Sequence, residues 1–150
     1  MSPNARDGRT GGPRADRTGL LHHVELYASD LEASAEFWGW LLGELGYEEH
    51  QCWEDGQSWK CGPTYLVLVR ADERFRDAEY HRRRPGLNHL AFHASSRDHV
   101  DELTDGLRAR GAPILYEDDH PYAGGPDHYA VYAEDPERIK VEVVAPSTDD

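Results

Sequence analysis

Three residues that can ligate a metal ion lie in three strand-like segments of the chain: His23, His89 and Glu142. In each segment the alternate positions are apolar, namely Val24/Leu26, Leu90/Phe92 and Val141/Val143. Because side chains alternate across a strand, we expect all three residues to point to the face opposite the apolar one. Two imidazoles and one carboxylate leave coordination positions open on a divalent ion, which suits Fe and is compatible with Mn, Ni or Zn.

Further residues on the same faces are suited to proton transfer. Glu25 lies two residues after His23 and is the carboxylate nearest to it in sequence, so it is a candidate base. Alternation also places Tyr132 and His128 on the face of Glu142. A neutral histidine can move a proton near physiological pH. We therefore regard Glu25, His128 and Tyr132 as candidate catalytic residues.

The elements that position these residues follow from hydrophobic periodicity and turn signals. In the first half, Ser29 and Glu32 have the spacing of a helix capping box, and Gly46 ends the helical pattern. A hairpin is expected around Asp55-Gly56, a favoured two-residue turn. The first half thus predicts strand 21–28, a helix, strands 47–53 and 58–61, and strand 64–70.

The second half has the same order of elements. The pattern predicts strand 87–94, a helix that Ser95 or Ser96 caps and Gly111 ends, a short strand 114–117, a Gly/Pro-rich loop 118–127, and strands 128–133 and 138–145. Leu21, His23, Ala28 and Ser29 recur 66 positions later as Leu87, His89, Ala94 and Ser95. Two such units cannot each close a core alone, so they must pair. We therefore expect an α+β fold of two β-α-β-β-β modules, at about 20–70 and 86–146, joined by a linker at 71–85.

The composition excludes several classes of protein. With 16 basic and 29 acidic residues, the formal net charge is −13, which disfavours nucleic-acid and membrane partners. The two cysteines form no disulfide framework, so we expect a reduced, cytoplasmic protein of one domain at 19–146. Residues 1–18 and 147–150 have no apolar periodicity and are expected to be disordered tails.

Five segments together resemble the vicinal oxygen chelate superfamily, which includes glyoxalase I, fosfomycin-resistance enzymes, extradiol dioxygenases and bleomycin-resistance proteins. They are His-Val-Glu-Leu at 23–26, Ser-Asp-Leu-Glu-Ala-Ser at 29–34, Gly-Leu-Asn-His-Leu-Ala-Phe at 86–92, Glu-Asp-Pro at 134–136 and Lys-Val-Glu-Val-Val at 140–144. The resemblance covers about 21–146. It implies an open, curved, eight-stranded barrel-like sheet with helices outside, and a divalent metal held by His23, His89 and Glu142.

The resemblance leaves the reaction open among isomerase, lyase and ring-cleaving dioxygenase chemistry. Glyoxalase I uses an acidic residue where this chain has Val67, which argues against a standard glyoxalase I reaction. Extradiol dioxygenases carry a tyrosine ten residues before the ligand glutamate, as Tyr132 precedes Glu142, and an acid-base histidine upstream that His120 or His128 resembles.

A second function from a different class is also compatible with the resemblance. Bleomycin-resistance members sequester a cationic aromatic drug without catalysis, and the acidic composition suits such a ligand. The complete His-His-Glu set favours the metal-dependent enzyme acting on a small-molecule substrate. Because edge strands of half-barrels often pair between chains, a homodimer is expected.

Overall fold

The structure is a computed structural model, and it describes residues 17–77 and 80–147. The two expected disordered tails therefore lie almost entirely outside the described residues. The elements in chain order are β1 (His23–Ala28), α1 (Leu31–Glu44), β2 (Glu48–Trp53), β3 (Gly56–Cys61), β4 (Thr64–Arg70), the short 3-10 helix η1 (Glu73–Phe75), β5 (His89–His93), α2 (Arg97–Ala109), β6 (Ala130–Glu134) and β7 (Lys140–Val144).

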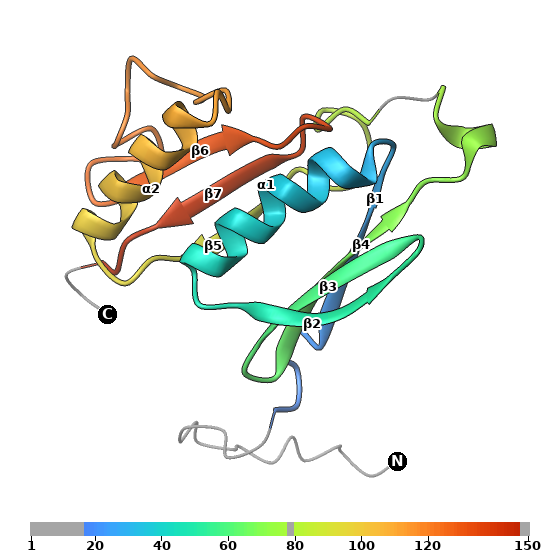
Figure 1. The fold of residues 1–150 in the computed structure, drawn as a ribbon. Coiled ribbons are helices and arrows are strands. Elements are labelled where there is room, and N and C mark those ends of the chain that lie inside the picture. Colours follow the sequence, from blue (N-terminus) through green and yellow to red (C-terminus); the bar gives the residue numbers. More distant parts are fainter. Residues whose placement is uncertain (1–16, 78–79, 148–150) are drawn as a thin grey trace, which may run out of the picture.

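The strands form two sheets, and each sheet belongs to one half of the chain. The first has the order β1-β4-β3-β2 and the second the order β5-β7-β6. Helix α1 packs on the first sheet and α2 on β6 and β7 (Figure 1). The α+β class and the pairing of two related modules are thus confirmed. An eight-stranded sheet is not: the described residues form seven strands.

The repeat is visible in the strand registers. The parallel pair β1–β4 aligns His23 with Tyr65 and Glu25 with Val67. The parallel pair β5–β7 aligns His89 with Lys140 and Ala91 with Glu142 in the same way. Val67 is therefore the equivalent of Glu142 in the first module.

The two modules share one hydrophobic core through the faces that carry the helices. Its buried members include Trp38 of α1, Leu68 of β4, Val100 of α2 and Val143 of β7. The indole of Trp38 also contacts Phe92 of β5, with ring centroids 6.2 Å apart. The residues expected to do chemistry are on the opposite faces of the two sheets, away from this core.

Three local expectations are corrected. The cap of α1 is Asp30, which accepts a hydrogen bond from the Ala33 amide, whereas the Ser29 amide donates to Glu137 at 2.6 Å. The β2–β3 loop is Glu54-Asp55, because Gly56 already pairs with Trp53 as the first residue of β3. The strand expected at 114–117 is reduced to one bridge between Ile114 and Ala133, because Tyr116 has a positive φ of 58° that ends the extended conformation.

The second helix begins where the sequence indicates. Of the two serines proposed as its cap, Ser96 is the one that accepts the hydrogen bond of the His99 amide. In the part of the chain that the structure describes, neither helix has the length and apolar character needed to cross a membrane.

Candidate active site on the second sheet

The candidate site is centred on Glu142, a carboxylate near the middle of β7 that is only 5% exposed. His89 approaches one of its oxygens, with Nε2 3.2 Å from Oε1. His128 contacts the other oxygen, Oε2, through its Nε2. Tyr132 lies directly opposite Glu142 on β6, as its cross-strand partner. The structure therefore brings together four of the six residues predicted from sequence.

A neighbouring amide fixes the orientation of His89. The Asn88 Oδ1 atom is 2.6 Å from Nδ1 of the His89 ring. Because an amide oxygen only accepts hydrogen bonds, this contact directs the Nδ1 proton to Asn88 and turns Nε2 towards Glu142. A histidine held in this way is suited to bind a metal through Nε2.

Tyr132 is poised to keep its proton. Burial, followed by the negative charge of Glu142 and the hydrogen bond to it, raises the pKa of Tyr132 to about 12. The phenol is therefore protonated at neutral pH and acts as a hydrogen-bond donor.

The loop 118–127 approaches these residues at Gly124. A Cβ atom at Gly124 would be 2.9 Å from the Tyr132 hydroxyl and closer still to the His128 ring. Glycine at this position lets the loop backbone approach the site.

The other two predicted residues lie on the first sheet. His23 stacks on Tyr65, with ring centroids 4.7 Å apart and an interplanar angle of 3°, and its Nδ1 is 2.9 Å from Nδ1 of His22. Glu25 is exposed on the same strand, beside Val67. No contact between His23 and the Glu142 group is present among the described residues.

These positions show how many of the predicted metal ligands a single chain brings together. His89 Nε2 and Glu142 provide two suitable donors that face each other. The third contact, from His128, reaches the other oxygen of the same carboxylate, which is a geometry of hydrogen bonds and not of three donors around one ion. Within residues 17–77 and 80–147, no group of three His, Cys, Asp or Glu side chains is arranged to hold a metal. One chain therefore provides only part of the predicted ligand set.

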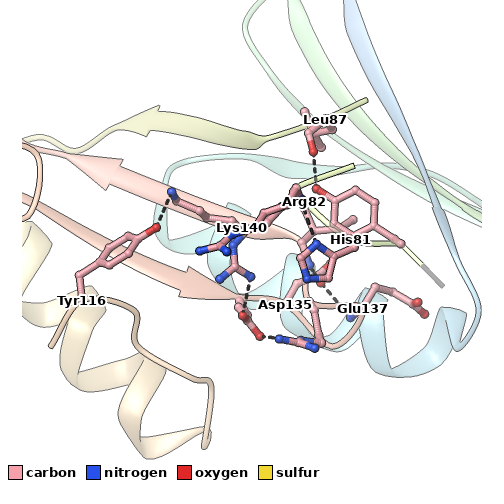
Figure 2. A network of polar contacts seen from close by, with 12 residues as sticks. His81, Arg82, Leu87, Tyr116, Asp135, Glu137 and Lys140 are labelled. Atoms are coloured by element: carbon pink, nitrogen blue, oxygen red, sulfur yellow. Dashed lines mark hydrogen bonds and ion pairs between the residues drawn. The ribbon is translucent and has the colours of Figure 1, made fainter. Parts of the chain in front are cut away.

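Sequence reasoning assigned no role to Lys140 and Tyr116, which complete this face. The Lys140 ammonium donates to the Tyr116 hydroxyl at 2.9 Å (Figure 2). Lys140 could have been found by the alternation that identified Glu142, since the two are two residues apart on β7. No sequence pattern points to Tyr116, because its position depends on a positive φ that the sequence does not reveal.

A groove of about 750 Å³ lies elsewhere, between the linker and the β6–β7 turn. Its walls include Tyr27, Phe75, Tyr80 and Arg138, and none of the predicted site residues lines it. The chemistry of the side chains, and not the size of the cavity, therefore identifies the candidate site.

Comparison with known proteins finds a family match and a close relative. Residues 20–143 match the family model of the Glyoxalase/Bleomycin resistance protein/Dioxygenase superfamily. The chain is 62% identical over 127 residues to the uncharacterised protein YqjT of Bacillus subtilis, covering 85% of this chain and 99% of that protein.

Solved structures show the same fold. A Bacillus halodurans structure, provisionally assigned as a glyoxalase, is 63% identical with a TM-score of 0.86, covering 87% of this chain and 98% of that one. A FosX fosfomycin resistance protein from Listeria monocytogenes, in complex with Mn(II) and 1S,2S-dihydroxypropylphosphonic acid, is 20% identical with a TM-score of 0.62. The similarity covers 87% of this chain and 93% of that one.

Proposed function

This chain belongs to the Glyoxalase/Bleomycin resistance protein/Dioxygenase superfamily, and from that premise we propose that it is a metal-dependent enzyme. Its substrate is a small molecule that chelates a divalent ion through two neighbouring oxygens. The observation that carries the proposal is the convergence of His89, His128 and Tyr132 on the buried carboxylate of Glu142. A cleft that only sequesters a ligand has no need for such a group of proton-transfer and ligating side chains.

The proposed ligands are His89 and Glu142 from one chain and His23 from a second copy. Fe, Mn, Ni and Zn all suit a set of two histidines and one carboxylate. The FosX structure, which contains Mn(II) and a diol on the same fold, supports an ion of this kind. His23 is the equivalent of His89 in the repeat and also begins a strand, so it has the right chemistry for the third position.

Two unpaired strand edges support the second copy. Strand β1 is at one end of the first sheet and β5 is at one end of the second, so each has one hydrogen-bonded neighbour in the described chain. In a two-fold dimer, β1 of one copy can lie beside β5 of the other, and this arrangement occurs twice. It would carry His23 and Glu25 towards the face that holds His89 and Glu142.

Side chains of this protein would share the work of proton transfer. The bound metal would polarise the substrate oxygens and stabilise negative charge that develops on them. Protonated Tyr132 would donate a hydrogen bond to a substrate oxygen, and His128 would accept or return a proton. Glu25, carried in with His23, would act as a base. An isomerase, a lyase and a ring-cleaving dioxygenase are all compatible with these roles.

The proposed setting is the cytoplasm. Both cysteines, Cys52 and Cys61, are free and exposed, which suits a reducing compartment. The net charge of −13 also favours a small-molecule substrate over nucleic acid or an anionic membrane as partner.

Metal content is the direct test. Elemental analysis of protein purified without chelator or added metal should find close to one ion per chain, and His89→Ala and Glu142→Ala should reduce it to background. Each substitution removes a direct ligand, which the remaining donors cannot replace. Iron would direct assays to catechols and oxygen uptake, whereas nickel, zinc or manganese would direct them to isomerase and lyase substrates.

Glu25→Ala is the matched control, because it removes an exposed strand carboxylate that is not a proposed ligand; its metal content should equal that of the wild type. If the wild type contains no metal and retains none after soaking in Fe(II), Mn(II), Ni(II) and Zn(II) separately, the enzyme proposal is wrong. Drug sequestration would then be the function to test.

A further inference from the structure

Lys140 lies beside two of the proposed metal ligands. It is the cross-strand partner of His89 in the β5–β7 pair. It also shares a face of β7 with Glu142, two residues further along the strand. Lys140 is half-buried, so its side chain lies against this face of the sheet.

Two tyrosines hold the Lys140 side chain. Its Nζ donates to the Tyr116 hydroxyl at 2.9 Å and lies 4.9 Å from the centre of that ring (Figure 2). The same ammonium lies 5.2 Å from the centre of the Tyr132 ring. Tyr116 reaches this position from a backbone with φ of 58°, a conformation that a non-glycine residue adopts at a cost. The arrangement therefore fixes the cation in place at the expense of local backbone energy.

The charge of Lys140 has no carboxylate partner among the described residues. Glu134 faces it across β6 and β7, but the Glu134 oxygens are bound by Arg82 at 2.8 Å and Arg138 at 3.4 Å. Aromatic rings attract a cation without neutralising it. In a protein with a net charge of −13, this fixed cation is available for an anion.

We propose that Lys140 and Tyr116 form an anion-binding subsite, and that the substrate is a small carboxylate whose vicinal oxygens lie next to its charged group. This inference rests on the proposed function, because it gives a substrate class to the same site. The Lys140 ammonium provides the charge, and the Tyr116 hydroxyl, which accepts from Lys140, still has its own proton to donate to a carboxylate oxygen. A 2-hydroxy acid fits both requirements, since its hydroxyl and carboxylate oxygens are neighbours.

Glycolate and glycolamide form a matched pair of probes for this subsite. Both are of the same size and have neighbouring oxygens, but only glycolate is charged. We would titrate each into metal-free full-length protein at low ionic strength and follow backbone amide chemical shifts by NMR. Glycolate should bind about tenfold more tightly than glycolamide, the ratio expected for one charge-assisted hydrogen bond.

Substitutions assign the preference to the proposed residues. Lys140→Met should bring the two affinities to within about twofold, and Lys140→Arg should preserve most of the preference because the charge is kept. Tyr116→Phe should weaken glycolate by about threefold, the loss of one neutral hydrogen bond. Equal binding of the two probes to the wild type, an unchanged preference in Lys140→Met, or no saturable shifts with glycolate would each overturn the inference.

The same experiment separates this inference from the proposed function. Metal content is measured in parallel, and Lys140→Met should keep the wild-type amount because Nζ is not a proposed ligand. A glycolate preference in a protein that never binds metal would support the subsite and contradict the metal-dependent enzyme. Bound metal without a glycolate preference would support the metal-dependent enzyme and contradict the subsite.

Discussion

At the scale of single residues, two buried carboxylates have different tasks. His89 and His128 contact the carboxylate of Glu142, and Tyr132 lies opposite it on β6, so Glu142 is the centre of the candidate site. Asp135, in the β6–β7 turn, accepts from the Trp38 indole at 2.9 Å and from the backbone amides of Glu137 and Ile139. It thereby joins the second module to helix α1 of the first. Burial raises the pKa of Asp135 to about 6, so this connection is sensitive to pH.

The sign of that sensitivity can be tested. Because the pKa of Asp135 is higher in the folded protein than the 3.8 of an exposed aspartate, the folded state binds the extra proton. The contribution to stability is present in full below pH 4 and is lost as the pH rises through 6. Relative to Asp135→Asn, the free energy of unfolding of the wild type should therefore be about 2 kcal/mol higher at pH 4.5 than at pH 7.5.

Urea denaturation followed by tryptophan fluorescence would measure this difference. Groups that titrate in both proteins cancel in the comparison, so an equal pH dependence in the two would contradict the assignment. The Asn variant should also be less stable at both pH values, because an amide cannot accept all three hydrogen bonds.

At the scale of elements, the β2–β3 hairpin contains a glycine that is required because a larger side chain would not fit, and not because of a positive φ. Gly56 begins β3 between Trp53 and Val69, its partners on either side. A Cβ atom there would be 2.7 Å from the Leu68 carbonyl oxygen and would collide with the Trp53 ring. Gly56→Ala should lower the free energy of unfolding by about 1–3 kcal/mol, the usual cost of overpacking.

Gly43→Ala is the matched control for this substitution. A Cβ at Gly43, near the end of α1, would have no atom within 4 Å. Alanine should therefore raise the stability by up to about 1 kcal/mol through helix propensity. Chemical denaturation of both variants gives the comparison, and a Gly56→Ala protein as stable as the wild type would show that the hairpin can move to make room.

At the scale of the whole molecule, the distribution of ligands over two sheets predicts a site shared between chains. We would co-express His23→Ala and Glu142→Ala chains with different tags and isolate the mixed dimer. One of its two sites then has His23 from one chain and His89 with Glu142 from the other, so it should contain about half of the wild-type metal. Each variant alone should contain none.

A mixed dimer without metal would show that His23 and Glu142 do not act across a dimer interface. A monomeric wild type in light scattering at micromolar concentration would contradict the arrangement directly. After either result, the metal content of the Glu142→Ala variant would still show whether the carboxylate is a ligand.

Apart from the strand expected at 114–117, the sequence alone determined the order of strands and helices, the duplication and the face on which each candidate residue within a strand lies. Those properties depend on local periodicity and on chain-wide repetition, which a sequence contains in full. The position of Tyr132 opposite Glu142 also followed from alternation, whereas His128 lies just before β6 and reaches Glu142 from the end of the preceding loop. The cap at Asp30 and the Glu54-Asp55 loop did not, because each depends on a one-residue choice between competing signals.

Only the tertiary structure decided which predicted residues meet. His23 and His89 are equivalent in the repeat, yet they lie on separate sheets because the modules share a core through their helix-bearing faces. The partnership of Lys140 and Tyr116 likewise depends on a positive φ and on a neighbouring Glu134 already bound to arginines. Such features arise from long-range packing and competition between partners, and no local pattern in the chain encodes them.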